Sequence, residues 1–198
     1  HQKFLNILVD QSNLLWIGTY YNGLYKIDLE SVAFLNSNDF VSVPDKQSKR
    51  FHKYPITVMA EDKKGDIWLG GLENGGLAKL KGSQLSKSLK EPSNHTWNLE
   101  YFNSPLINNI RRLYIDTQDK IWIGSLTGLN VVKNSSSDNF EIASVDELVS
   151  KKRAVFSIEE DHNGSMWIGY WGEGLVKLNK NSNYFDVEEY QYLSLIHI

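Results

Sequence analysis

One motif occurs four times along the chain, and it limits the possible folds more than any other feature of the sequence. Each copy has an Asp, a Trp six residues later, then Ile or Leu and Gly directly after the Trp, and a Gly-Leu pair after a short gap. The copies are DQSNLLWIGTYYNGL (10–24), DKKGDIWLGGLENGGL (62–77), DTQDKIWIGSLTGL (116–129) and DHNGSMWIGYWGEGL (161–175). A unit that recurs about every 50 residues predicts a fold built by stacking similar supersecondary units.

The structural residues of this repeat fall into three sets, each with one member per copy. They are the aspartates Asp10, Asp62, Asp116 and Asp161, the tryptophans Trp16, Trp68, Trp122 and Trp167, and the glycines Gly18, Gly70, Gly124 and Gly169. An apolar residue also recurs three and six positions before each Asp. Because they are present in every copy, we expect these positions to build the fold rather than a single site.

The residues around each Asp predict a β-hairpin. The residue three positions after the Asp is Asn13, Gly65, Asp119 or Gly164, and these residue types tolerate the positive φ that completes such a turn. The Asp carboxylate can accept hydrogen bonds from the turn amides, which explains its fixed place without catalysis. A second strand with the large Trp follows the turn, and a third strand follows each Gly-Leu step. The expected fourth strands are FHKY (51–54), LEYF (99–102) and YFDVEEY (184–190).

Four-stranded units of this size are typical of β-propeller blades. The predicted fold class is therefore all-β, with about four four-stranded blades centred near residues 4–54, 56–102, 107–150 and 155–190. We expect residues 1–190 to be an incomplete arc of a larger propeller, because the repeat is already under way at the first residues. The tail 191–198 matches no repeat position and stays unassigned.

Composition and motif content exclude several functional classes. The 198-residue chain has a net charge of −3, which offers no basic surface for nucleic acid. It has no cysteine, so disulfides and thiolate metal sites are excluded, and no apolar run reaches the roughly 20 residues that cross a membrane. No nucleophile elbow, Walker loop or zinc-protease motif occurs. We expect no catalytic residues, no metal, no cofactor, no nucleic-acid partner and no direct membrane contact.

The residues that differ between the copies predict a ligand site. In a propeller blade, the loop from strand two to strand three and the crossing to the next blade lie at one edge of the sheet, which we call the rim. The candidate ligand-binding residues on the rim are Tyr20, Tyr21, Glu73, Asn74, Asn108, Arg111, Arg153, Tyr170, Trp171 and Glu173. Aromatic faces stack on sugar rings, and amide, carboxylate and guanidinium groups bond sugar hydroxyls. The alternative is that these aromatics cover the blade ends or pack against a neighbouring domain.

The pattern apolar-x-x-apolar-x-x-Asp-x-x-Gly-x-apolar-Trp-Ile-Gly-Thr, followed by Gly-Gly-Leu, resembles the two-component regulator propeller repeat. Four copies between residues 4 and 190 carry the resemblance, with departures at Asp119, Gly71, Ser125 and Tyr170. The resemblance implies the periplasmic sensor region of an inner-membrane-anchored hybrid histidine kinase of Bacteroidetes, which controls transcription in response to carbohydrate. It also implies an oligosaccharide ligand, further propeller blades, downstream signalling domains and a homodimer partner. Since the 198 residues contain no kinase core, we expect no enzymatic activity from this chain.

Two other functions stay open at this stage. A propeller enzyme resembling streptogramin lyases would need His or carboxylate side chains that converge on the central channel, and the repeats show no such departure. A purely structural interaction platform would need no ligand at all.

Overall fold

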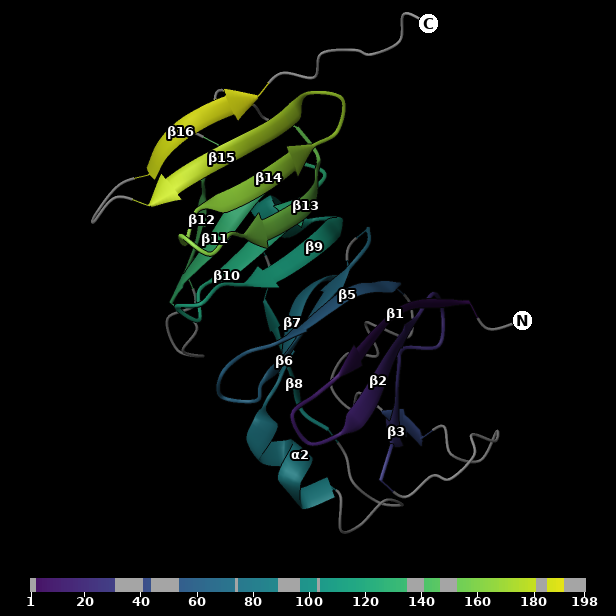
Figure 1. Cartoon of the computed structure of the whole chain (residues 1–198). Helices are drawn as coiled ribbons and strands as arrows, with labels where there is room; N and C mark the ends of the chain where they lie inside the picture. Colours follow the sequence, from purple (N-terminus) through teal and green to yellow (C-terminus); the bar gives the residue numbers. More distant parts are fainter. Residues whose placement is uncertain are drawn as a thin grey trace, which may run out of the picture. The chain divides into compact units, whose positions relative to one another are not determined.

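The strands of the described residues form four antiparallel four-stranded sheets, which confirms the prediction of all-β propeller blades. The computed structural model describes residues 3–30, 41–43, 54–73, 75–88, 97–102, 104–134, 141–146, 153–180 and 185–190. In each sheet the strands are hydrogen-bonded in chain order, as Figure 1 shows for β13 to β16. The chain divides into two compact units, His1–Ile110 and Arg111–Ile198.

We number the sheets as blades 1 to 4. Blade 1 contains β1 (Phe4–Val9), β2 (Leu14–Thr19), β3 (Leu24–Asp28) and β4 (Val41–Val43). Blade 2 contains β5 (Ile56–Glu61), β6 (Ile67–Gly71), β7 (Gly76–Leu80) and β8 (Leu99–Phe102), with the helix α2 (Gly82–Ser88) between its last two strands. Blade 3 contains β9 (Ile110–Ile115), β10 (Ile121–Ser125), β11 (Gly128–Asn134) and β12 (Glu141–Ser144), and the 3-10 helix η2 (Pro105–Ile107) precedes it. Blade 4 contains β13 (Val155–Glu160), β14 (Met166–Tyr170), β15 (Gly174–Lys180) and β16 (Phe185–Tyr190).

The fourth strands are the least regular part of the sheets. LEYF is β8 and most of YFDVEEY is β16, as predicted. The prediction of FHKY for blade 1 is wrong, because Val41–Val43 pairs with β3 and buries Val43 in the core. Residues 51–53 of FHKY lie outside the described residues, and Tyr54 is in no strand. The helix α2 between β7 and β8 was not predicted from the sequence.

The Asp of each repeat organises both the turn and the tryptophan. The turn residues Asn13, Gly65, Asp119 and Gly164 have φ values of 58°, 77°, 65° and 79°, as predicted. In every copy, Oδ1 of the Asp accepts hydrogen bonds from the amides two and four residues later, at 2.8 to 3.0 Å. In every copy, Oδ2 also accepts a bond from the indole Nε1 of the Trp, at 2.7 to 3.0 Å. This indole bond, which the sequence analysis missed, fixes the ring that the blade packs around.

Each unit has its own apolar cluster. In the first unit, Trp16 meets Trp97 edge to face with ring centroids 6.0 Å apart, and side chains of blades 1 and 2 surround the pair. In the second unit, Trp122 of blade 3 packs in one cluster with Val155, Ile158 and Ile168 of blade 4. Blades within a unit are therefore joined by buried apolar side chains, which is the main stabilising contribution in such repeats.

A lysine lies against the ring of most repeat tryptophans. The strand register places Lys79 opposite Trp68 and Lys177 opposite Trp167, and their Nζ atoms lie 5.2 and 5.3 Å from the ring centroids. In blade 3 the position opposite Trp122 is Val131, and Lys120 approaches that ring instead, at 5.6 Å. Such cation–π contacts contribute about 0.5 to 2 kcal/mol each, more when the ammonium is desolvated.

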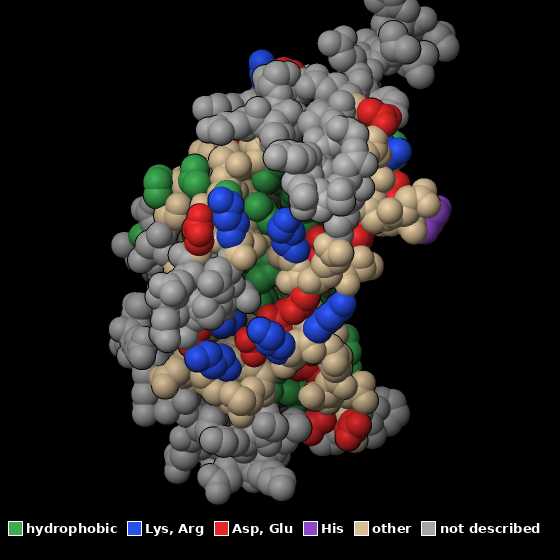
Figure 2. Space-filling view, turned by 90° about the vertical axis from the view of Figure 1, so that its left-hand side faces the viewer, with side chains coloured by type: hydrophobic (Ala, Val, Ile, Leu, Met, Phe, Trp, Pro, Cys, Tyr) green, Lys and Arg blue, Asp and Glu red, His purple; other side chains and the backbone are tan. Residues whose placement is uncertain are grey.

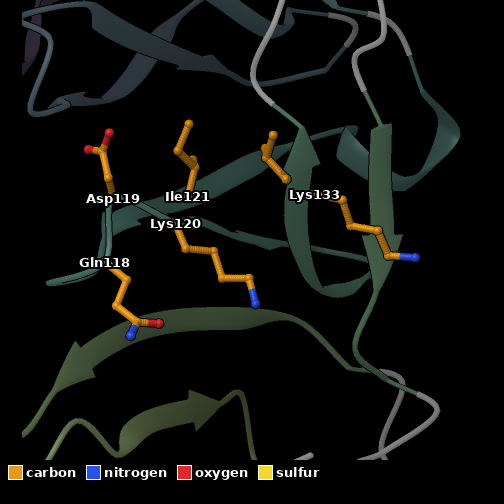
Figure 3. A pocket seen from close by; sticks show the side chains of 6 residues that line it. Gln118, Asp119, Lys120, Ile121 and Lys133 are labelled. Atoms are coloured by element: carbon orange, nitrogen blue, oxygen red, sulfur yellow. The ribbon is translucent and has the colours of Figure 1, made fainter. Parts of the chain in front are cut away.

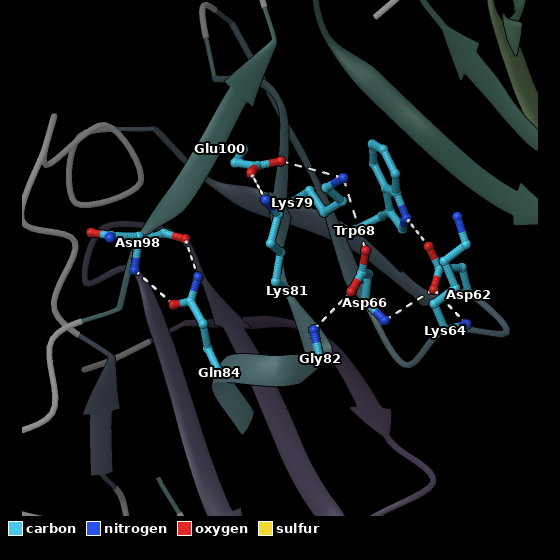
Figure 4. Close-up of polar contacts among 10 residues, drawn as sticks. All are labelled: Asp62, Lys64, Asp66, Trp68, Lys79, Lys81, Gly82, Gln84, Asn98 and Glu100. Carbon is cyan, nitrogen blue, oxygen red and sulfur yellow. Dashed lines mark hydrogen bonds and ion pairs between the residues drawn. The ribbon is translucent and has the colours of Figure 1, made fainter. Parts of the chain in front are cut away.

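Blade 2 adds a buried ion network around Lys79 (Figure 4). Lys79, only 4% exposed, lies 3.3 Å from Glu100 and 3.9 Å from Asp66. Lys81 pairs with the other oxygen of Glu100 at 2.5 Å, and Asp66 accepts the Gly82 amide at 2.8 Å, which ties the start of α2 to the network. Burial alone would raise the pKa of Glu100, but the bonds and charges of Lys81 and Lys79 outweigh it and lower that pKa.

The lowered pKa of Glu100 predicts that acid reduces the stability of the fold. A carboxyl with a lower pKa in the folded state stabilises the fold above its unfolded pKa of about 4.3, and that contribution disappears as the pH falls through the folded pKa. We expect Glu100→Gln to be less stable than the wild type at pH 7, because it leaves Lys79 without one partner. The difference should shrink between pH 5 and pH 3. Urea denaturation at several pH values measures it, and a difference that stays constant with pH would contradict the assignment.

Candidate ligand-binding site

The first strand of a blade carries a β-bulge directly after its first residue. The register shifts between Phe4 and Asn6 in β1, between Ile56 and Val58 in β5, and between Val155 and Ser157 in β13. The residues at these bulges are Leu5, Thr57 and Phe156, and Arg111 has the same position in β9. Bulges re-aim side chains and are common beside binding sites. The same backbone irregularity thus presents a different side chain in each of these three blades.

The loops from strand two to strand three lie against the residue that precedes the first strand of the same blade. Tyr20 N donates to Lys3 O at 3.0 Å, Leu72 N to Pro55 O at 3.1 Å, and Trp171 N to Ala154 O at 2.9 Å. In three blades the two segments predicted to share the rim are therefore hydrogen-bonded to each other. At the rim, side chains of the loop, of the residues before the first strand and of the bulge can therefore contact one ligand.

In the second unit, a residue of the loop and two residues at the bulge position meet in one aromatic and cationic cluster. The rings of Phe156 and Trp171 lie 5.1 Å apart, tilted by 40°, and the guanidinium carbon of Arg111 lies 5.7 Å from the Phe156 centroid. Trp171 is 70% exposed and Phe156 is 43% exposed. The Nε atom of Arg111 is buried and has no hydrogen-bond partner among the described residues. We call Arg111, Phe156 and Trp171 the rim cluster.

An ion pair stands beside the rim cluster. Arg153 Nε lies 2.7 Å from Glu173 Oε1. Arg153 precedes β13, and Glu173 is two residues after Trp171 in the loop between β14 and β15. Both side chains are partly exposed, at 61% and 27%. The pair therefore keeps donor and acceptor atoms available to a molecule that stacks on the Trp171 ring.

Of the candidates in the second unit, Tyr170 requires a correction. It was predicted on the rim, but it is the last residue of β14 and is 5% exposed within the apolar cluster of that unit. The alternation of side chains along β14 places Met166, Ile168 and Tyr170 on the buried face. Tyr170 therefore belongs to the core.

The described candidates in the first unit do not form a comparable cluster. Tyr20 and Tyr21 pack on each other with centroids 4.4 Å apart, and Tyr21 is 66% exposed. Glu73, with φ 54°, is held by a bond of 2.6 Å from its amide to Asn109 Oδ1. Asn108 is exposed at the end of η2, and Asn74 lies outside the described residues.

Phe156 is the site residue that the sequence reading missed. It directly follows the apolar residue that recurs six positions before each Asp, and the four copies have Leu5, Thr57, Arg111 and Phe156 at this place. The sequence did contain a signal for it. The residue type at this position differs between the copies, whereas the position directly before it is apolar in every copy. Without the bulge, period-two alternation would have assigned this residue to the opposite sheet face.

A cavity of about 290 Å³ opens at the other edge of blade 3 and is lined by Gln118, Asp119, Lys120, Ile121, Val132 and Lys133 (Figure 3). The amines of Lys120 and Lys133 point in different directions there, and Lys133 lies 3.4 Å from Glu141. The lining therefore offers no converging set of polar groups. Among the described residues, no group of three or more His, Cys, Asp or Glu side chains could hold a metal ion.

The charged side chains show no concentration of one sign in the view of Figure 2, where described Lys and Arg residues lie among Asp and Glu residues. None of the helices in the described ranges has the length and apolar character that a membrane crossing requires.

Four sheets of four strands with a repeated Asp–Trp turn define a β-propeller segment. Residues 151–172 match the family described as Two component regulator propeller. This segment contains the fourth copy of the motif, and the other three copies make the same Asp–Trp bond.

Two further similarities are to a histidine kinase and to a protein described as a two component system. Histidine kinase P4 of Formosa agariphila is 25% identical over 140 residues, which are 71% of this chain and 9% of the kinase. The extracellular domain of a protein described as a hybrid two component system, from B. thetaiotaomicron, has a TM-score of 0.63 at 22% identity over 96% of this chain. That match covers 22% of the solved chain, so this chain spans a small part of both relatives.

An enzyme shares the fold as well. A gluconolactonase from Xanthomonas campestris has a TM-score of 0.59 at 9% identity, over 94% of this chain and 61% of the enzyme. At this level of identity the similarity concerns the propeller fold alone.

Proposed function

We propose that this chain is an extracytoplasmic, ligand-sensing propeller segment of a hybrid two-component sensor and that it binds an oligosaccharide at the rim cluster. The observation that carries the ligand assignment is the Trp171 ring, which is 70% exposed and packs at 5.1 Å on Phe156. The similarity to histidine kinase P4 and to the extracellular domain from B. thetaiotaomicron supports the sensor assignment and the location.

The chemistry of the cluster suits a sugar ring. An exposed indole that packs at a tilt on another ring can contact the C–H groups of a pyranose, at little cost in conformational entropy. The Arg153–Glu173 pair supplies both a donor and an acceptor for ring hydroxyls. The half-buried guanidinium group of Arg111, which lies against the Phe156 ring, supplies further donors.

Sensing requires that the ligand prefers one conformation of the receptor. The ligand would shift the population toward the state in which loop 171–173 and the residues before β13 are held together. Both segments contact the ligand in this proposal, and one backbone hydrogen bond already joins them. Downstream signalling domains would then respond to that shift.

Trp171→Ala tests this assignment. We expect at least one member of a panel of neutral and acidic oligosaccharides to raise the melting temperature of the wild type in a saturable way. The substitution should weaken that binding by at least about 10-fold, or 1.4 kcal/mol, as expected for an aromatic anchor. Thermal shift identifies the ligand and calorimetry measures the affinity.

Tyr21→Ala is the matched control, since Tyr21 is a similarly exposed aromatic in the first unit. It should leave the affinity unchanged. Binding that survives Trp171→Ala would refute the rim cluster as the site. Conversion of any bound compound to product would refute the assignment as a binding segment and favour an enzyme.

A further inference from the structure

The second unit contains three arginines, and two of them are paired with glutamates. Nη2 of Arg112 lies 2.7 Å from Oε1 of Glu159, and Nε of Arg153 lies 2.7 Å from Oε1 of Glu173. Arg111, the third, makes no ion pair or hydrogen bond within the part of the chain that the structure describes. The rim cluster therefore has a positive charge that no described carboxylate pairs with.

The guanidinium group of Arg111 contacts the Phe156 ring, and its terminal nitrogens stay available. Its carbon lies over the ring, 5.7 Å from the centroid. A cation–π contact attracts the charge but supplies none of the oxygen acceptors that guanidinium N–H groups bond. Of the three guanidinium nitrogens, only Nε is both buried and unbonded, so the two Nη atoms are accessible. The open end of the side chain thus presents two N–H donors side by side.

Two parallel donors with a full positive charge fit an acidic group better than a hydroxyl. A carboxylate offers two oxygen atoms in the matching geometry, and two oxygens of a sulfate ester can take the same places. Charge-assisted bonds of this kind are about twice as strong as bonds between neutral groups. Because Arg111 is half-buried, water and salt screen the interaction less than on an open surface. A hydroxyl would accept one bond and leave the charge unpaired.

The position of Phe156 lets one molecule reach both the indole and the guanidinium group. The Phe156 ring lies 5.1 Å from the Trp171 ring, and the guanidinium carbon of Arg111 lies 5.7 Å from the same Phe156 ring. Trp171 and Arg111 are thus separated by no more than the phenyl ring that both contact. A short oligosaccharide is therefore long enough to stack on Trp171 and to reach Arg111 with an acidic substituent.

The charge at this position is specific to blade 3, since the same position holds Leu5, Thr57 and Phe156 in the other blades. We propose that Arg111 gives the rim cluster a preference for acidic oligosaccharides, by pairing end-on with a carboxylate or sulfate group of the sugar. This inference rests on the proposed function, because it names the class of oligosaccharide bound at the same site. The indole of Trp171 provides affinity for the sugar ring, and the guanidinium group of Arg111 distinguishes the acidic sugar from its neutral counterpart.

Pairs of sugars that differ only in their acidic groups test this assignment by calorimetry. The carboxylated pair is trigalacturonate and its methyl ester, and the sulfated pair is a carrageenan oligosaccharide with and without its sulfate groups. We expect the wild type to bind the acidic member of at least one pair about 10-fold more tightly than the neutral member. Arg111→Gln should abolish that preference while the neutral member still binds. The pair that responds shows whether the acidic group is a carboxylate or a sulfate.

Arg112→Gln is the matched control, because it removes a positive charge from the adjacent residue, which pairs with Glu159. It should leave the preference unchanged, and its loss there would overturn the role of Arg111. Equal binding of acidic and neutral sugars, with both lost in Trp171→Ala, would also overturn it and leave the proposed function standing. Triglutamate bound as tightly as trigalacturonate would overturn the assignment of a sugar. Absence of binding to every sugar would refute the proposed function itself.

Discussion

Replacing Asp62 by Ala is expected to lower the free energy of unfolding by about 3 kcal/mol, because one carboxylate accepts three hydrogen bonds at this position. Its Oδ1 accepts the amides of Lys64 and Asp66 at 3.0 and 2.9 Å, and its Oδ2 accepts Trp68 Nε1 at 2.9 Å (Figure 4). Trp68 is fully buried, so its indole N–H would have no water to replace the lost acceptor. Urea denaturation followed by tryptophan fluorescence measures the change.

Asp161→Ala provides the control for this prediction. Asp161 makes the same three bonds, to Asn163, Ser165 and Trp167, but Asp161 and Trp167 are only half-buried. The hydrogen bond from Trp167, followed by that from the Ser165 amide, lowers the pKa of Asp161. We expect a clearly smaller loss of stability, since water can reach the freed donors. Equal losses at both positions would mean that burial does not set the contribution of this bond.

Gly124→Ala is expected to cost about 2 kcal/mol, although it adds only one methyl group. That methyl would lie 2.7 Å from Cγ1 of Val155 and 3.1 Å from its carbonyl oxygen. The two strands would have to separate, because backbone on one side and a fully buried valine on the other leave no space. Urea denaturation measures the loss, and hydrogen exchange should show faster opening in β10 and β13.

Gly169→Ala is the matched variant, because Gly169 has the same repeat position in the same unit. The added methyl would collide with the side-chain oxygen of Ser157, which can rotate away, and would lie 3.5 Å from the Ser157 Cβ. We expect a change in stability within about 0.5 kcal/mol of zero. A large loss here, or none for Gly124→Ala, would show that the glycine is required for another reason than contact with the next strand.

The sequence was sufficient to predict those parts of the fold that depend on residues close together in the chain. The Asp, its turn and the Trp lie within seven residues, so residue type alone specified the positive φ at Asn13 and the capped turn at Asp10. Four copies then identified the blade, because a sheet that cannot bury both faces must stack with others like it.

Contacts between segments that are far apart in the sequence could not be predicted from residue types and the repeat alone. Val41–Val43 rather than FHKY forms the fourth strand of blade 1, because the pairing depends on which segment can bury an apolar side chain after a long connection. Tyr170 resembled a rim residue in the alignment of copies, but the alternation of β14 places it in the core.

The rim cluster was the feature that the sequence predicted least completely, because its residues meet only in the tertiary structure. Trp171 was identified from the sequence because it is an aromatic residue in a loop that varies between copies. Its neighbour Phe156 comes from β13 of the same blade, with ring centroids 5.1 Å apart. The packing of blade 3 on blade 4 brings the guanidinium carbon of Arg111 to 5.7 Å from the Phe156 ring. The sequence by itself determined the blade and its turn, since both are local. Tertiary structure decided which variable side chains meet, because the bulges set their direction and blade packing sets their distance.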